Sequence, residues 1–331
     1  MDVLSDVLRC VRLTGSMFFL VNASMPWITK APAASVFASA VLPAAQHLIS
    51  YHVITEGHCW AGLEGEVPQR LEAGDILVVP HGDPYMLSAS PETRAELADE
   101  EALRFFRSMA AGELPSVVVE GGGGPETTNF ICGFLGCDAR PFNPILAALP
   151  RVLYLRGATE RGGRMSHLVE FALCELRERR SGSREVLLRL SELMFIETVR
   201  CHLASALEAE AGWFVGLRDP MVARVLARLH AEPERGWTLD ALADDVAASR
   251  SVLAERFTRL VGQPPMHYLK AWRMQLAARM LMDRSAKVRT VAEAVGYESE
   301  AAFSRAFKRL AGSAPTQYRE SFPEKGFVRF A

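Results

Sequence analysis

Two stretches of this 331-residue chain carry the same residue types at the same spacing. With Ser249 and Ser299 as origins, seven offsets over 20 residues are identical. The pairs are Ser249/Ser299, Phe257/Phe307, Arg259/Arg309, Leu260/Leu310, Gly262/Gly312, Pro265/Pro315 and Tyr268/Tyr318. An arginine can bond phosphate oxygens, and a serine can accept the first free amides of a helix. The repeat therefore predicts one polar, cationic surface presented twice.

Each copy is typical of a helix-turn-helix. In the first copy, Thr238 caps a helix over Leu239–Ala247, a tight turn follows, and Ser249 caps a second helix. That second helix buries offsets +4, +8 and +11, so offsets +2, +6 and +9 point away from the core. Small, polar and charged side chains on such a face suit a major groove, where base edges are read. A connecting helix over Met266–Met282 would span about 25 Å and can hold the two second helices about 34 Å apart, one turn of the duplex.

The outward and flanking positions supply the candidate DNA contacts. Arg305 is the expected base reader, since a guanidinium bonds guanine O6 and N7 together. Glu255 can accept from a cytosine amine, or it can disfavour wrong sites by repelling phosphates. Four basic residues are better placed for phosphates: Arg256, Arg259, Lys308 and Arg309. The full candidate set is Arg250, Ser251, Ala254, Glu255, Arg256, Arg259, Glu300, Ala301, Ser304, Arg305, Lys308 and Arg309.

Charge is divided unevenly along the chain. The net charge is −2, but residues 217–331 carry 19 Lys and Arg against 13 Asp and Glu, a net of +6. The remainder carries a net of −8. Basic modules commonly bind polyanions. A solvated face on an ordinary helical bundle is the alternative for a single copy, but two copies in a basic module favour double-stranded DNA.

The order and spacing of the second copy closely resemble the signature of AraC/XylS-type transcriptional regulators. It reads Ala292, Gly296-Tyr297, Ser299, Phe303, Arg305, Phe307-Lys308, Gly312, Pro315 and Tyr318-Arg319. The first copy resembles the same family's first helix-turn-helix, and the resemblance covers about 217–320. It implies a bacterial transcription factor, usually an activator that contacts RNA polymerase. One residue departs: Ala247 stands where the second copy has Gly296, which predicts a strained or differently shaped first turn.

Two further patterns lie in the first half of the chain. Ser50-x-His52-x3-Glu56 and Gly74-x5-Pro80-x-Gly82-x2-Tyr85 fit the two cupin motifs, with Ser50 and Tyr85 in place of histidines. The region resembles the cupin-like sensor half found on a branch of the same family. In that branch three elements recur, here His58-Cys59-Trp60, Gly74-Asp75 and Cys132-Gly133.

The substituted motifs argue against a catalytic cupin. Such an enzyme holds iron or manganese with about three His and a carboxylate, and only His52 and Glu56 remain in register. His58, Cys59 or His81 would have to complete a different metal site, so we expect no metal, no other cofactor and no enzymatic activity. Barrel mouths are common ligand sites, which favours a pocket for a small-molecule effector. Its expected lining is His52, Glu56, Trp60 and Tyr85. A pocket filled by its own side chains and a metal-dependent cupin enzyme with a DNA-binding tail are the alternatives.

The cysteines suggest a different switch. Some relatives with this sensor half respond to oxidants through cysteine, so an oxidant-responsive regulator switched through Cys132 is a further hypothesis, against a buried structural thiol. Cys137 lies five residues on, which on a strand puts the two side chains on opposite faces, so a direct disulfide needs a bend. Six cysteines without a CxxC pattern predict a reducing, cytoplasmic setting.

The periodicity outlines the organisation of the chain. Short strands are predicted at Ser50–Ile54, Cys59–Leu63 and Ile76–Val79, with a helix at Glu96–Ala111 and a flexible linker at Gly121–Gly124. Two amphipathic helices follow, Met165–Arg179 and Arg184–Glu210. The apolar residues of the second helix cover more than one stripe. They predict packing within its own domain or also on a second subunit, as in a homodimer.

These features together predict an α+β protein. It comprises an N-terminal cupin-like β-barrel with a helical dimerisation segment and a C-terminal all-α domain with tandem helix-turn-helix motifs. The expected boundaries are an effector-sensing domain at 1–160, a helical linker and dimerisation segment at 161–212, the DNA-binding domain at 217–320 and a tail at 321–331. The apolar stretch Ala31–Ala45 contains Pro32 and Pro43 and is shorter than the ~20 residues of a membrane span, so no membrane association is expected.

Overall fold

A computed structural model describes residues 2–10, 13–43, 45, 47–93, 99–115, 117–137, 141–160, 162–205 and 212–321. The contacts divide the chain into two compact units. A sheet-rich unit is formed by Arg12–Asp138 and Leu149–Ser205. A helical unit is formed by Met1–Val11, Ala139–Ala148 and Ala206–Ala331. The helical unit therefore includes two short segments from the first half of the sequence.

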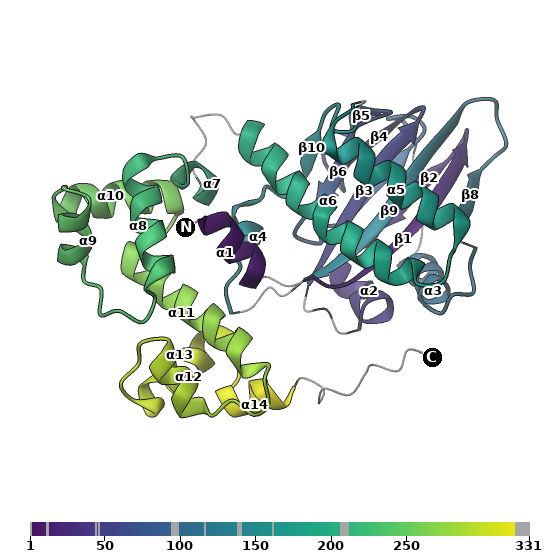
Figure 1. Cartoon of the computed structure of the whole chain (residues 1–331). Coiled ribbons are helices and arrows are strands. Elements are labelled where there is room, and N and C mark those ends of the chain that lie inside the picture. Colours follow the sequence, from purple (N-terminus) through teal and green to yellow (C-terminus); the bar gives the residue numbers. More distant parts are fainter. Residues whose placement is uncertain are drawn as a thin grey trace. The chain divides into compact units, whose positions relative to one another are not determined.

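The sheet-rich unit contains two sheets that face each other (Figure 1). The six-stranded sheet has the order β10 (Leu153–Leu155), β6 (Ile76–Val79), β3 (His47–Glu56), β9 (Thr127–Cys137), β1 (Leu13–Ser24) and β8 (Val117–Gly121). The four-stranded sheet has the order β2 (Ile28–Ala31), β7 (Tyr85–Ser88), β4 (His58–Leu63) and β5 (Gln69–Glu72). The three strands expected from the sequence fall within β3, β4 and β6, and the α+β class is confirmed.

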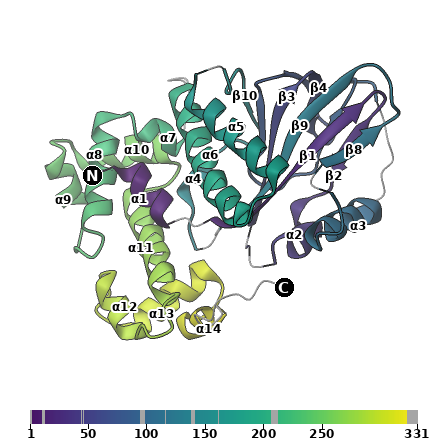
Figure 2. The ribbon, with the colours of Figure 1, turned by 45° about the vertical axis from the view of Figure 1, so that its right-hand side comes forward.

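Both faces of the six-stranded sheet are covered. Side chains of both sheets form a single hydrophobic cluster between them. Helices α5 (Arg164–Glu178) and α6 (Ser183–Ser205) lie across the outer face of the larger sheet (Figure 2). Tyr51 of β3 points to these helices, where Thr198 donates to its hydroxyl at 3.2 Å. Such two-sided cover explains why β3 is buried at nearly every position. Helix α6 covers the helix predicted over 184–210 as far as Ser205. Residues 206–210 of that prediction lie outside the described residues.

Two shorter helices flank the sheets. Helix α2 (Ala34–Val41) packs on α3 (Asp99–Ala110), and Phe37 stacks on Phe106 with ring centroids 4.3 Å apart. Helix α3 corresponds to the helix expected at 96–111, of which residues 96–98 lie outside the described residues. Within the described ranges, no helix is both long and apolar enough to cross a bilayer.

The four glycines at 121–124 form a turn tied to its neighbours, so the prediction of a flexible linker is wrong. The amide of Gly122 donates to the Pro26 carbonyl at 3.1 Å, and that of Gly124 donates to the Met25 carbonyl at 2.9 Å. Gly121 has a φ of +95°, and a Cβ there would overlap a neighbouring carbonyl oxygen. Glycine is therefore required for close backbone approach rather than for mobility.

The helical unit is built around one long helix. Helix α11 (Pro265–Leu281) packs on both halves of the unit. The other helices are α1 (Val3–Cys10), α4 (Pro144–Ala148), α7 (Trp213–Gly216), α8 (Pro220–Ala231), α9 (Leu239–Asp245), α10 (Arg250–Val261), α12 (Val288–Ala294), α13 (Glu300–Ala311) and α14 (Pro315–Glu320). The predicted connecting helix at 266–282 and α11 agree to within one residue at each end.

Two segments from the first half of the sequence complete the helical unit. Helix α1 packs on α8 and α11, and its Arg9 carbonyl accepts from Arg279 at 2.7 Å. Before α4, the Phe142 amide donates to Gln275 at 3.1 Å. The Phe142 ring also meets Tyr268 edge to face, with centroids 5.5 Å apart. Both segments therefore belong to the packing around α11.

Candidate nucleic-acid interface and sensor cavity

The two helix-turn-helix motifs share their capping geometry. Ser249 accepts from the Val252 amide at 3.3 Å, and Ser299 accepts from the Ala302 amide at 3.4 Å. At the other ends, the glycines that follow α10 and α13 both have a φ of +84°. A left-handed residue at this point ends a helix with little strain only if it is glycine. The tandem motifs expected from the repeat are confirmed.

The turns also match in conformation although their residues differ. Gly296 has a φ of +78° and Ala247 a φ of +53°, so both adopt the left-handed region. The first turn is therefore strained rather than differently shaped. A Cβ on Gly296 would clash with the Glu234 backbone, whereas Ala247, at the same position of the first copy, is exposed.

Ala247→Gly should stabilise the helical unit. The left-handed conformation costs an L residue roughly 1–2 kcal/mol, and glycine avoids this cost. Glycine also gives the unfolded chain more conformational freedom, which lowers the free energy of unfolding by about 0.5–1 kcal/mol. The expected net gain in the free energy of unfolding is therefore about 0.5–1 kcal/mol. Urea denaturation followed by circular dichroism measures it. Gly296→Ala is the matched control and should destabilise the unit, and a loss of stability in Ala247→Gly would contradict the strain.

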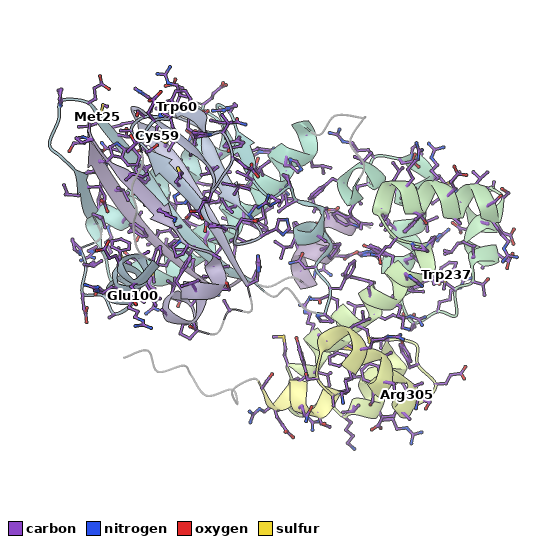
Figure 3. The ribbon with its side chains drawn as sticks, turned by 180° about the vertical axis from the view of Figure 1, so that it is seen from behind. Met25, Cys59, Trp60, Glu100, Trp237 and Arg305 are labelled. Carbon is purple, nitrogen blue, oxygen red and sulfur yellow. The ribbon has the colours of Figure 1, made fainter. Side chains whose placement is uncertain are left out.

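Outward side chains line the second helix of each motif. Residues of α10 at Arg250, Ser251, Glu255, Arg256 and Arg259 are exposed, and Ala254 is partly buried. On α13, Glu300, Ala301, Arg305, Lys308 and Arg309 are exposed, and Ser304 is partly buried. Arg305 lies on the outside of the helical unit (Figure 3). The structure thus places all twelve candidate residues on two accessible helices.

Internal ion pairs separate these cations into two groups. Arg250 pairs with Asp240 at 3.1 Å, and Arg256 donates from Nε to Asp219 at 2.8 Å. Asp219 also caps α8, so Arg256 is fixed to the scaffold. Within the described residues, no ion pair engages the other four cations: Arg259, Arg305, Lys308 and Arg309. These four are free to meet an external anion.

The spacing of the two motifs depends on α11. Its 17 residues correspond to about 25 Å of rigid helix. Tyr268 and Trp272, near its N-terminal half, are fully buried. Its C-terminal half shares a separate core with α12, α13 and α14. Each helix-turn-helix therefore has its own hydrophobic core, and α11 joins the two.

A buried chain of hydrogen bonds crosses the sheet-rich unit. His52 of β3 is 3.0 Å through Nδ1 from the Cys132 thiol and 2.7 Å through Nε2 from the Tyr85 hydroxyl. Cys132 is the register neighbour of His52 on β9, whereas Tyr85 belongs to the facing sheet. Burial lowers the pKa of His52 to about 3 and raises the pKa of Cys132 well above its usual value. The histidine is therefore neutral and the thiol protonated at physiological pH.

The three hydrogen-bonded side chains, His52, Tyr85 and Cys132, form one wall of a cavity of about 160 Å³ inside the sheet-rich unit. Aromatic rings form much of the remaining wall: Phe19, Phe105, Phe106 and Phe134. The polar lining residues are Thr29, Lys30, His52, Tyr85, Glu101, Glu120 and Cys132. Volume, apolar walls and a few polar groups suit a small organic ligand.

Two of the four expected effector residues line this cavity, and two do not. His52 and Tyr85 are in its wall. The pairing of β3 with β9 shifts its register between Ile54 and Glu56, and the exposed Glu56 accepts from Asn129 at 2.6 Å. Trp60 alternates with the buried Cys59 and Ala61 of β4, so its side chain lies on the outer face of the small sheet.

The remaining candidates are dispersed. Burial raises the pKa of the Cys59 thiol to about 12. His81 lies 2.9 Å through Nε2 from the Leu149 carbonyl, and His58 begins β4. Among the residues that the structure describes, no three His, Cys, Asp or Glu side chains gather as a metal would require. No disulfide joins Cys132 to Cys137, which lie on opposite faces of β9.

Sequence reasoning missed most of the cavity wall. Glu120 lies on β8, and Glu101, Phe105 and Phe106 lie on α3. The sequence offered no local signal for them: β8 begins with three valines in a row, and the alternation of the buried Val118 with the exposed Val119 is seen only in the structure.

Comparison with known proteins gives matches to both halves of the chain. A family model described as Cupin matches residues 2–204, and one described as Helix-turn-helix domain matches residues 242–321. An AraC-like transcription regulator of Streptomyces lividans is 32% identical over 97% of this chain and 98% of its own. The HTH-type transcriptional regulator AlkR of Acinetobacter baylyi is 28% identical over 97% of this chain and 99% of its own. Among solved structures, the DNA-binding domain of AdpA in complex with a target DNA is 33% identical, with a TM-score of 0.29, over 31% of this chain and 92% of that one.

Proposed function

This chain belongs to the family of AraC-like transcription regulators with a cupin sensor domain, and from that premise we propose that it reads its operator through α10 and α13 and that a small molecule in the sensor cavity controls it. One observation supports the reading of DNA: the exposed faces of both second helices hold cations that no ion pair engages among the residues that the structure describes. Arg305 then contacts a base edge, while Arg259, Lys308 and Arg309 contact phosphates.

The same proposal covers the regulator's partners. As an activator, it contacts RNA polymerase beside a promoter in the cytoplasm. It acts as a homodimer, which the exposed Phe171 on α5 and Leu193 on α6 support, because large apolar side chains on a helical face suit a second subunit. Its activity is binding and not catalysis, which the relatives named as transcription regulators support.

Arg305→Ala should weaken binding to the specific operator by about 1–3 kcal/mol and relax the preference at one base position. A bidentate contact to guanine carries that discrimination. Arg309→Ala, the matched control on the same helix, should weaken binding to all sequences alike. Fluorescence anisotropy with the DNA upstream of the protein's own gene measures both, at one fixed salt concentration because phosphate contacts make affinity salt-dependent. Equal losses of Arg305→Ala on specific and random DNA would contradict its role.

The same titration distinguishes control of DNA binding by an effector from control by an oxidant. Reactive cysteines need a thiolate, and burial holds the Cys132 thiol in its protonated form. Mild oxidation should therefore leave the affinity for DNA unchanged. A shift that disappears in Cys132→Ser would favour the thiol switch and would reduce the cavity to a structural feature.

A further inference from the structure

The sensor cavity contains a carboxyl group that no cation pairs with among the described residues. Glu120 lies on β8, on the same face of the strand as the buried Val118, and its carboxyl lines the cavity. Within the described residues, no hydrogen bond or ion pair engages that carboxyl. Burial raises the pKa of Glu120, and no cation among the residues that the structure describes lowers it. The ionised form of such a half-buried carboxyl is stabilised when a cation lies beside it.

The other polar groups of the cavity do not supply that cation. Lys30 pairs with Glu64 at 2.8 Å, which neutralises it. His52 is neutral because burial lowers its pKa to about 3, and the Tyr85 phenol and the Cys132 thiol stay protonated because burial raises the pKa of each. Glu101 on α3 adds a second carboxyl among the lining residues. The lining therefore contains two carboxyl groups, and its lysine is already paired with Glu64.

A second polar atom is also unsatisfied. The hydroxyl of Thr29, another lining residue, is buried and finds no hydrogen-bond partner within the described part of the chain. A hydroxyl and a carboxylate can both accept hydrogen bonds, and an ammonium group has three donors to offer. A bound carboxylate, in contrast, would meet the like charge of Glu120.

The apolar part of the wall determines the body of the ligand. Phe105 lies 5.9 Å from Phe19 and 5.5 Å from Phe106 between ring centroids, and Phe134 lies 5.3 Å from Phe106. The volume of about 160 Å³ is close to that of an apolar protein cavity of about 150 Å³ that binds benzene. One ring or a short aliphatic chain fits, and aromatic faces attract cations.

From this arrangement we propose that the cavity binds a small organic amine in its cationic form, with one ring or a short apolar body among the phenylalanines and its ammonium group at Glu120 and Thr29. The proposal rests on the sensing role stated above and names the chemical class of the effector.

Three probes of equal ring size test the charge. Isothermal titration calorimetry with the full chain, without DNA, compares 2-phenylethylamine, 2-phenylethanol and phenylacetate at neutral pH. The amine should bind about tenfold or more tightly than the alcohol, and the acid should bind weakest, as a charge-assisted hydrogen bond predicts. Equal binding of amine and alcohol, tighter binding of the acid, or binding of none of the three would overturn the proposal.

Two variants assign the effect to one residue. Glu120→Gln should remove the advantage of the amine and leave the affinity for the alcohol unchanged, which also shows that the cavity is intact. Glu113→Gln makes the same chemical change at an exposed site outside the cavity and should behave like the parent protein. An amine preference that persists in Glu120→Gln would overturn the assignment.

A separate titration distinguishes this proposal from the sensing role. If the amine binds through Glu120 and also shifts the affinity for operator DNA, both stand. If it binds through Glu120 without any effect on DNA binding or on transcription from the promoter, the ligand class stands and the sensing role fails.

Discussion

Phe307→Ala should reduce the free energy of unfolding by about 3–5 kcal/mol and remove protection from one half of the operator. Phe307 is fully buried in α13, between Phe303 at 5.6 Å and Tyr318 at 5.2 Å from ring centroid to ring centroid. Truncation leaves a void in the small core that the second motif shares with the end of α11. Because natural domains are stable by only about 5–15 kcal/mol, that loss is sufficient to disorder α13.

Phe257→Ala is the matched variant in the first motif. Phe257 holds the same offset on α10, is equally buried and packs on Tyr268 at 5.9 Å between ring centroids. Hydroxyl-radical footprinting should show each variant losing one half of the protected region, a different half in each case. Urea denaturation of the full chain gives the stability change. Loss of the whole footprint in both variants would contradict two separate hydrophobic cores joined by α11.

Acid should destabilise the sheet-rich unit through His52. Burial lowers its pKa to about 3 in the folded chain, whereas the unfolded chain binds the proton near pH 6.5. Between these values the unfolded state carries more protons, so stability is complete above about pH 6.5 and declines as the pH falls towards 3. From pH 7 to pH 5 the expected loss is about 2 kcal/mol from this residue alone. Urea denaturation at several pH values measures it.

The control for the acid effect keeps the chain and removes the titrating group. His52→Gln should decline by about 2 kcal/mol less than the parent over the same pH range, since glutamine takes up no proton. His167→Gln changes an exposed histidine of the same unit and should keep the slope of the parent. Identical slopes for His52→Gln and the parent would show that the acid loss has another origin.

Features fixed by neighbouring residues could be predicted from the sequence. The serine caps, the glycines that end α10 and α13 and the proline that begins α11 act within one or two helical turns, so their spacing alone predicts both motifs. The spacing of the first cupin-like motif also placed His52 correctly in the wall of the cavity. In these cases the physical cause lies within about ten residues of its effect.

Features that depend on distant strands could not be predicted in this way. The inward face of Glu120 exists because β8 pairs with β1, about a hundred residues earlier in the chain. A single irregularity in the pairing of β3 with β9 places Glu56 outside the cavity although its motif spacing is intact. The aromatic wall contributed by α3 follows from how that helix packs on α2. None of these relations leaves a local pattern.

The position of α1 in the helical unit has a consequence for how the protein folds during its synthesis on the ribosome. Its Val3 and Val7 are buried, and its partners α8 and α11 begin more than 200 residues later. At a synthesis rate of about 5–20 residues per second, α1 spends about 10–40 s in the cell before those partners exist. The sheet-rich unit can form during that interval. The helical unit closes only after α11 has been made, when α1 meets helices that are translated more than 200 residues after it.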